Sequence, residues 1–169
     1  EADRRVFSLE ESIEIRDGDR SIRADPAKGL RISYAIDFDH ALIGRQALEI
    51  PRLDKASFRS ELAAARTFGF EREVEALQKS GLGLGGSLDN TVVLGTSGIL
   101  NSDGLRYSDE FVRHKVIDLV GDLALLGIRL EAHVQVERGG HALHHALVRA
   151  LAVVALEQSR SPGRVDSRA

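Results

Sequence analysis

The residues with the clearest chemistry in this sequence recur at four-residue steps within an apolar stretch: His114, Asp118 and Asp122. If residues 108–126 form a helix, these side chains share one face, with about 5–6 Å between neighbouring Cβ atoms. Nitrogen and oxygen ligands placed in this way can bind one divalent ion, so a Zn²⁺ site is the first hypothesis. The alternative is a hydrogen-bonded pair in which Asp118 orients a buried His114 imidazole.

The surroundings of these side chains favour a functional role. Most other residues of the 108–126 segment are apolar, so we expect the helix to be enclosed. A carboxylate buried in such a helix is costly unless it is paired or bound to a metal. Lys115 lies beside the histidine and has two interpretations, a surface lysine or a point charge that contacts a phosphate.

A second histidine cluster consists of His141, His144 and His145, which closely follow two glycines. The positive end of a helix dipole disfavours a protonated histidine in the first helical turn. His141 would therefore need a nearby carboxylate to stay protonated as a general acid. Asp122 is the candidate for that carboxylate.

Composition and length exclude several classes of protein. The chain has 169 residues, which suits one domain, or one half of a two-domain protein. Its net charge of −3 and its dispersed basic residues predict no nucleic-acid partner. The lack of cysteine excludes disulfides, thiolate metal sites and cysteine nucleophiles. No apolar run approaches the roughly 20 residues of a membrane span, and we expect a cytoplasmic protein.

Residues 81–86 match the spacing of the glycine motif G-x-G-x-x-G, which binds dinucleotides. That motif needs a strand before the glycines and a helix after them, so that the helix N-terminus faces a pyrophosphate. In this chain we expect a helix before the glycines and a strand after them. We therefore interpret these residues as a flexible loop. The sequence also lacks the serine-hydrolase motif G-x-S-x-G and the zinc motif H-E-x-x-H.

Hydrophobic periodicity and turn signals divide the chain into short strands and a few helices. The predicted strands cover residues 6–9, 12–17, 20–24, 30–38, 91–94 and 132–136. The predicted helices cover residues 55–65, 71–79, 108–126 and 141–157. An irregular link that contains Pro51 precedes the first of these helices. Because most strands come early and the helices are inserted and appended, we expect an α+β fold with helices over one face of an antiparallel sheet.

Further motifs occur along the chain, among them A-R-T-F-G-F at residues 65–70 and G-G-H-A-L at residues 139–143. The others are residues 85–90, 100–101, 104–107 and 109–122. In type and order, these motifs resemble those of the zinc-dependent UDP-3-O-acyl-N-acetylglucosamine deacetylases of lipid A biosynthesis, the LpxC family. The resemblance implies a two-layer sandwich of a mostly antiparallel sheet packed on helices. It also implies that residues 70–100 form an inserted β-α-β unit that provides a hydrophobic passage for an acyl chain.

The resemblance implies separate catalytic roles for the residues singled out above. His114 and Asp118 would be two of the three protein ligands of a catalytic Zn²⁺, which keeps its fourth position for water. His141 would be the general acid, and Asp122 would orient it. Thr67 would help to stabilise the tetrahedral oxyanion.

Other positions match substrate contacts of the family. Lys115 would lie near the diphosphate, and Asp37 and Phe38 would lie near the nucleotide, where the aromatic ring can stack on uracil. Phe68 would also contact the substrate. The sequence departs from the family at residues 144–145, which are both histidine here and commonly asparagine there.

The resemblance extends to one of the family's two similar domains. Residues 1–157 match the C-terminal domain, and residues 158–169 are predicted to be a disordered tail. The N-terminal domain, which supplies the third zinc histidine and the glutamate general base, has no counterpart here. The sequence also begins at Glu1 and contains no methionine, so we expect a fragment whose partner is the missing domain.

With that domain, the expected reaction is zinc-dependent hydrolysis of the N-acetyl group of UDP-3-O-acyl-N-acetylglucosamine. We expect little or no activity from the isolated chain. Two other hypotheses stay open. The chain can be a non-catalytic metal- or ligand-binding module that kept the fold, or a structural domain with a buried His–Asp network.

Overall fold

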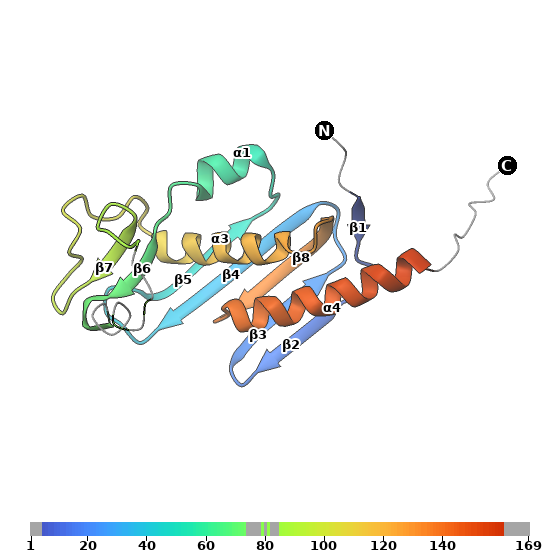
Figure 1. Ribbon diagram of the computed structural model, residues 1–169, viewed down its shortest axis with the longest axis horizontal. Coiled ribbons are helices and arrows are strands. Elements are labelled where there is room, and N and C mark those ends of the chain that lie inside the picture. Colours follow the sequence, from blue (N-terminus) through green and yellow to red (C-terminus); the bar gives the residue numbers. More distant parts are fainter. Residues whose placement is uncertain (1–4, 74–78, 80, 82–84, 161–169) are drawn as a thin grey trace.

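The computed structural model describes residues 5–73, 79, 81 and 85–160. It contains a six-stranded sheet and helices that cover one of its faces (Figure 1). Most pairings in this sheet are antiparallel, so the predicted α+β sandwich is confirmed. Most of the predicted helix at residues 71–79 and most of the predicted tail lie outside the described residues.

Two long parallel neighbours, β4 and β8, form the middle of the sheet. The strands are β1 (Val6–Ser8), β2 (Ile13–Asp17), β3 (Arg20–Asp25), β4 (Leu30–Phe38), β5 (Gly44–Ile50) and β8 (Arg129–Glu137). Their order is β2-β3-β8-β4-β5, and β1 pairs with the beginning of β8 in the parallel sense. The sequence therefore predicted every strand of this sheet except β5.

Strand β5 lies in the link for which the sequence predicts no regular structure. It begins at Gly44, which has a φ of 58° and closes the preceding turn, because its amide donates to the carbonyl of His40 at 2.9 Å. Arg45 and Glu49 are exposed, and Ile50 is the one fully buried residue of the strand. The apolar alternation is therefore weak, and antiparallel pairing with β4 makes this segment a strand.

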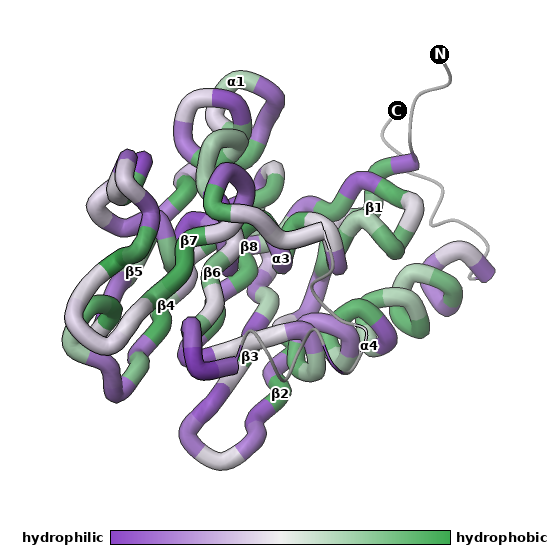
Figure 2. The backbone as a smooth tube through the Cα atoms, turned by 60° about the vertical axis from the view of Figure 1, so that its left-hand side comes forward, coloured by the Kyte–Doolittle hydropathy of each residue, from purple (hydrophilic) through white to green (hydrophobic). Residues whose placement is uncertain are grey.

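Two long helices cover the same face of the sheet (Figure 1). α3 (Glu110–Ala124) packs on β4 and β5, and α4 (His141–Arg160) packs on β2 and β3. From β4, Ile32 and Ile36 are buried beneath them. Along each strand and helix, hydrophobic residues alternate with hydrophilic ones, whereas the turn between β2 and β3 is mostly hydrophilic (Figure 2). The core therefore lies between the sheet and the two helices.

The boundaries of the long helices differ from the predicted ones. α3 begins after Asp109 and not at Ser108, and the Asp109 carboxylate accepts from Arg113 Nε at 2.6 Å instead of capping the helix. α4 continues to Arg160, three residues beyond its predicted end at residue 157. Helix ends depend on side-chain partners that periodicity does not reveal.

The predicted helix at residues 55–65 is shorter and less regular than expected. It consists of α1 (Lys55–Ser57) and a π-helical turn, η1 (Phe58–Leu62). Asp54 starts α1 with a capping box, because its carboxylate accepts from the backbone amides of the first turn and the Ser57 hydroxyl accepts from the Asp54 amide. The A-R-T-F-G-F motif comes after this helix, and its Gly69 lies in a strand.

A small second sheet lies at one end of the molecule, beyond the start of α3 (Figure 1). It pairs β6 (Thr67–Phe70) with β7 (Thr91–Leu94) in the parallel sense. Parallel neighbours need a crossover connection, which agrees with an inserted β-α-β unit, although the middle of that crossover lies outside the described residues. The buried Asn101 side chain supports β7, because it accepts from the amide of Val93 at 2.9 Å.

A buried ion pair connects this small sheet to α3. Arg66 precedes β6, Glu110 is the first residue of α3, and both side chains are almost fully buried. Glu110 Oε1 accepts from the backbone amide and from Nε of Arg66, both at 2.9 Å. Its Oε2 accepts from the backbone amide of Arg106 at 2.6 Å. Burial alone would raise the pKa of Glu110, but these hydrogen bonds outweigh burial and lower the pKa.

We expect Glu110→Gln to reduce the free energy of unfolding by about 3 kcal/mol, because it removes the buried counter-charge of the Arg66 guanidinium and leaves only the exposed Asp103 carboxylate, 3.1 Å from Arg66 Nη1. Urea unfolding followed by circular dichroism measures this loss. The matched control is Glu137→Gln, which removes the partner of an exposed arginine, Arg45. We expect a much smaller effect from the control.

The same ion pair predicts a pH dependence. Because the pKa of Glu110 is lowered in the folded state, its stabilisation is complete above the usual value of 4.5 and is lost as the pH falls through the lower, native value. The difference between wild type and Glu110→Gln should therefore shrink in acid. An equal difference at neutral and strongly acidic pH would contradict this account.

Candidate functional site

His114 and Asp118 lie one turn apart on α3, and their side chains face each other. His114 Nδ1 is 3.6 Å from Asp118 Oδ1, and the side chains are 19% and 15% exposed. Burial is the largest influence on the pKa of His114 and lowers it, and Asp118 only partly offsets this effect. The imidazole is therefore neutral near pH 7, which is the form that can bind a metal. The predicted proximity of the two residues agrees with the structure.

Lys115 lies beside this pair. Its Nζ is 3.1 Å from Asp118 Oδ2, so the two oxygens of the Asp118 carboxylate face different partners. The lysine side chain is 21% exposed, which leaves its ammonium group within reach of a solvent-borne anion. Lys115 is thus partly enclosed, unlike a typical surface lysine, but it is still open to solvent.

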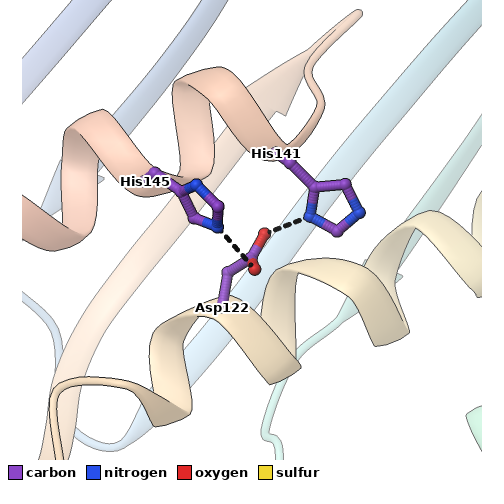
Figure 3. Close-up of side chains that lie close together, drawn as sticks. All are labelled: Asp122, His141 and His145. Atoms are coloured by element: carbon purple, nitrogen blue, oxygen red, sulfur yellow. Dashed lines mark hydrogen bonds and ion pairs between the residues drawn. The ribbon is translucent and has the colours of Figure 1, made fainter.

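The Asp122 carboxylate accepts hydrogen bonds from three histidines of α4. Its Oδ2 lies 2.7 Å from His141 Nδ1 and 2.8 Å from His144 Nδ1, and its Oδ1 lies 3.0 Å from His145 Nε2. Figure 3 shows His141 and His145 of α4 on either side of the carboxylate, which projects from α3. The predicted pairing of Asp122 with His141 is thus present. Burial alone would raise the pKa of Asp122, but the three hydrogen bonds outweigh it and lower the pKa.

This arrangement corrects the first hypothesis, in which spacing alone places Asp122 with His114 and Asp118 in one metal site. Asp122 turns toward α4, and within the described part of the chain the one group of three metal-type ligands is Asp122, His141 and His145. Shared helix spacing places the three α3 side chains on one face, but the packing of α4 draws the last one away.

The innermost contact of this cluster, between Tyr34 and His144, was not predicted from the sequence. His144 is fully buried, and its Nε2 lies 3.0 Å from the hydroxyl of Tyr34, which is also buried. The available signals were the spacing of His144 from His141, which places both on one helix face, and the inward-facing position of Tyr34 in its strand. Neither signal identifies a partner by itself.

Phe38, Phe68 and Phe111 form an aromatic row from the end of β4 to α3. The Phe38 and Phe68 ring centroids are 5.6 Å apart, those of Phe68 and Phe111 are 5.0 Å apart, and both contacts are edge-to-face. Thr67 and Asp37 are exposed at the adjoining strand ends. The row therefore brings the predicted nucleotide-contacting Phe38 and the predicted substrate-contacting Phe68 into contact with each other.

The turn before α4 is tightly packed. An added Cβ at Gly139 would lie 2.3 Å from Val136 Cγ1 and 3.3 Å from the hydroxyl oxygen of Tyr34. Gly140 has no atom within 4 Å of the same position. Of these two glycines, only Gly139 is therefore too close to its neighbours to carry a side chain. Its turn leads directly into α4, which begins at His141.

Comparison with known proteins identifies the family of this α+β protein with a His–Asp site. A family model described as UDP-3-O-acyl N-acetylglycosamine deacetylase matches residues 1–153, and the chain belongs to this LpxC family. A UDP-3-O-acyl-N-acetylglucosamine deacetylase of Nitratidesulfovibrio vulgaris is 52% identical over 148 residues, which cover 88% of this chain and 47% of that protein.

Relatives with the same description give a similar picture. The protein of Oleidesulfovibrio alaskensis is 49% identical over 88% of this chain and 48% of its own length. The protein of Acidithiobacillus ferrooxidans is 46% identical over 89% of this chain and 50% of its own length. The chain thus spans about half the length of the curated relatives it matches. Within the described residues, no helix is both long and apolar enough to cross a membrane.

We expect Gly139→Ala to reduce the free energy of unfolding by about 1–3 kcal/mol, because the new methyl group meets a β-branched side chain in a packed core. Urea unfolding measures the loss, with Gly140→Ala as the matched neighbouring control. Equal stabilities for the two variants would contradict the close packing at Gly139.

Proposed function

We propose that this chain carries one half of the active site of a zinc-dependent UDP-3-O-acyl-N-acetylglucosamine deacetylase, which removes the N-acetyl group during lipid A synthesis. The observation that carries the proposal is the hydrogen bond between His141 Nδ1 and Asp122 Oδ2. Asp122 lies on α3 with the His114–Asp118 pair, and His141 reaches it from α4, so the acid–base pair and the ligand pair are held by two packed helices. The family and the names of the relatives support the same reaction.

The donor set suits zinc at His114 and Asp118. A neutral imidazole and a carboxylate are ligands that zinc prefers, and their facing atoms are close enough to approach one ion. The ring nitrogens of His141 and His145 in the second group act instead as hydrogen-bond donors to Asp122. A zinc ion supplies polarisation of the amide carbonyl and activation of water when it is bound.

His141 acts as the general acid toward the leaving amine. Its Nδ1–H donates to Asp122, which is ionised because its pKa is lowered, and the side chain is 59% exposed. Nε2 therefore faces outward and can carry the proton that the leaving nitrogen needs. The hydrogen bond to Asp122 keeps the ring in this orientation.

Other groups, some exposed and some partly buried, bind the substrate around this centre. The Thr67 hydroxyl donates to the developing oxyanion, and Lys115 contacts the diphosphate. Asp37 and Phe38 contact the nucleotide, and Phe68 contacts the sugar or its acyl chain. The unit around β6 and β7 provides the passage for that chain.

The site is completed by an N-terminal half that supplies a third zinc ligand and the general base. Two ligands on one helix leave further coordination positions open, which agrees with a chain of about half the length of its relatives. We also propose a cytoplasmic location, which suits a water-soluble nucleotide sugar as substrate.

Zinc binding tests the assignment of the metal ligands. We expect His114→Ala and Asp118→Ala each to weaken Zn²⁺ binding to the chain by about tenfold or more, because each removes a direct ligand. Isothermal titration calorimetry with ZnCl₂ measures the affinity. His133→Ala is the control, because His133 is paired with Ser33 on β8 and β4. If His145→Ala weakens binding and His114→Ala does not, the metal belongs to the Asp122 group instead.

Activity tests the proposed function as a whole. We expect no turnover by the chain alone, and zinc-dependent release of acetate after fusion to the N-terminal half of the Nitratidesulfovibrio vulgaris relative. In the fusion, His141→Ala should reduce kcat by about 10²–10⁴-fold, because the leaving amine loses its proton donor. His133→Ala again serves as the control. Turnover by the isolated chain would refute the two-part site, and an inactive fusion that binds zinc would favour a non-catalytic module.

A further inference from the structure

A buried tyrosine and a buried histidine lie behind the Asp122 carboxylate. Tyr34 of β4 and His144 of α4 are 1% and 0% exposed. The Tyr34 hydroxyl lies 3.0 Å from His144 Nε2, and His144 Nδ1 lies 2.8 Å from Asp122 Oδ2. The proposed reaction gives neither residue a role, because neither reaches the surface where a substrate would lie.

The chemistry of these groups determines where the protons lie. An ionised carboxylate only accepts hydrogen bonds, so His144 Nδ1 carries a proton and donates to Asp122. Burial lowers the pKa of His144, so the ring is neutral and its Nε2 holds a lone pair. Burial raises the pKa of Tyr34, so its hydroxyl keeps its proton and donates to that lone pair. Three buried groups thus form one directed chain of hydrogen bonds.

Of the three histidines that donate to Asp122, His144 is the one held in place by burial. His141 and His145 approach from the exposed side, where an imidazole loses rotamer freedom when it is held in place. His144 is already immobilised, because it is enclosed and its ring meets the Tyr34 ring edge-on, with centroids 5.8 Å apart. His144 and His141 donate to the same oxygen, Oδ2, so a rotation of the carboxylate would disturb both bonds.

We propose that Tyr34 and His144 are positioning residues, which hold the Asp122 carboxylate from the buried side and thereby aim His141 at the leaving group. The proposal rests on the role of His141 as general acid in the proposed function. Correct aim matters because a small misplacement of a catalytic group can cost about a hundredfold in rate.

The packing of Gly139 supports this role. A Cβ at that position would lie 3.3 Å from the Tyr34 hydroxyl oxygen and 3.7 Å from His144 Nε2. The glycine therefore leaves room for the hydrogen bond between Tyr34 and His144, two residues before His141. The absence of a side chain at Gly139 thus permits both the tight turn before α4 and the hydrogen bond between Tyr34 and His144.

The tautomer of His144 is the first test, and it uses the chain itself. Two-bond ¹H–¹⁵N spectra of the imidazoles should show a single neutral tautomer with the proton on Nδ1. Tyr34→Phe removes the hydroxyl that donates to Nε2 and keeps the ring, so we expect the ¹⁵N chemical shift of Nε2 to change while the proton stays on Nδ1. The chain's other tyrosine provides the control, Tyr107→Phe, because its hydroxyl contacts the Ser60 carbonyl at 3.4 Å. A proton on Nε2 in the wild type, or no response to Tyr34→Phe, would overturn the proposal.

The second test separates positioning from packing in the fusion described above. We expect His144→Leu, which removes the donor, to lower kcat by about tenfold to a hundredfold and to change KM by less than about twofold. His144→Asn keeps an N–H near the place of Nδ1 and should recover most of kcat. Equal kcat in the two variants, or a loss confined to KM, would overturn the positioning role. If the wild-type fusion shows no turnover, the proposed function fails, whereas the tautomer measurement still decides the arrangement of Tyr34 and His144.

Discussion

The Asp122 carboxylate joins the two helices that cover the sheet. It projects from α3 and accepts hydrogen bonds from His141, His144 and His145 of α4. Apolar packing alone tolerates small shifts of one helix along another, whereas hydrogen bonds to a single carboxylate are directional and select one arrangement. The position of His141, on α4, relative to His114 and Asp118 of α3 therefore depends on this carboxylate. The same contact keeps Asp122 charged, because a paired carboxylate can remain ionised where an unpaired one cannot.

The opposite end of α3 is held by a second polar contact. Glu110, its first residue, pairs with buried Arg66, which directly precedes β6 and the exposed Thr67. His114 and Asp118 lie between this contact and Asp122, on a helix whose geometry is regular. Their positions therefore follow from the helical repeat once both ends are placed. A helix that is held at both ends is a rigid support for groups that must act together.

The two kinds of site group differ in exposure, and this difference fits their proposed roles. His114 and Asp118 are mostly enclosed, which favours a neutral imidazole and strengthens the electrostatic attraction for a cation. His141 is more than half exposed, as suits a group that exchanges protons with substrate and water. An open arrangement of this kind also suits a site completed by another segment, since ligand sites often lie where domains meet.

Local periodicity determined much of this protein from sequence. The four-residue spacing of His114, Asp118 and Asp122 placed them on one helix face, and the alternation in residues 30–38 predicted β4. Strand β5 and the Arg66–Glu110 pair could not be predicted, because both depend on partners supplied by distant segments. The same holds for Tyr34 and His144, which are 110 positions apart and meet only in the folded chain. Sequence thus determined which side chains share a face, whereas the tertiary structure decided which buried polar groups meet, because each needs a partner that only packing provides.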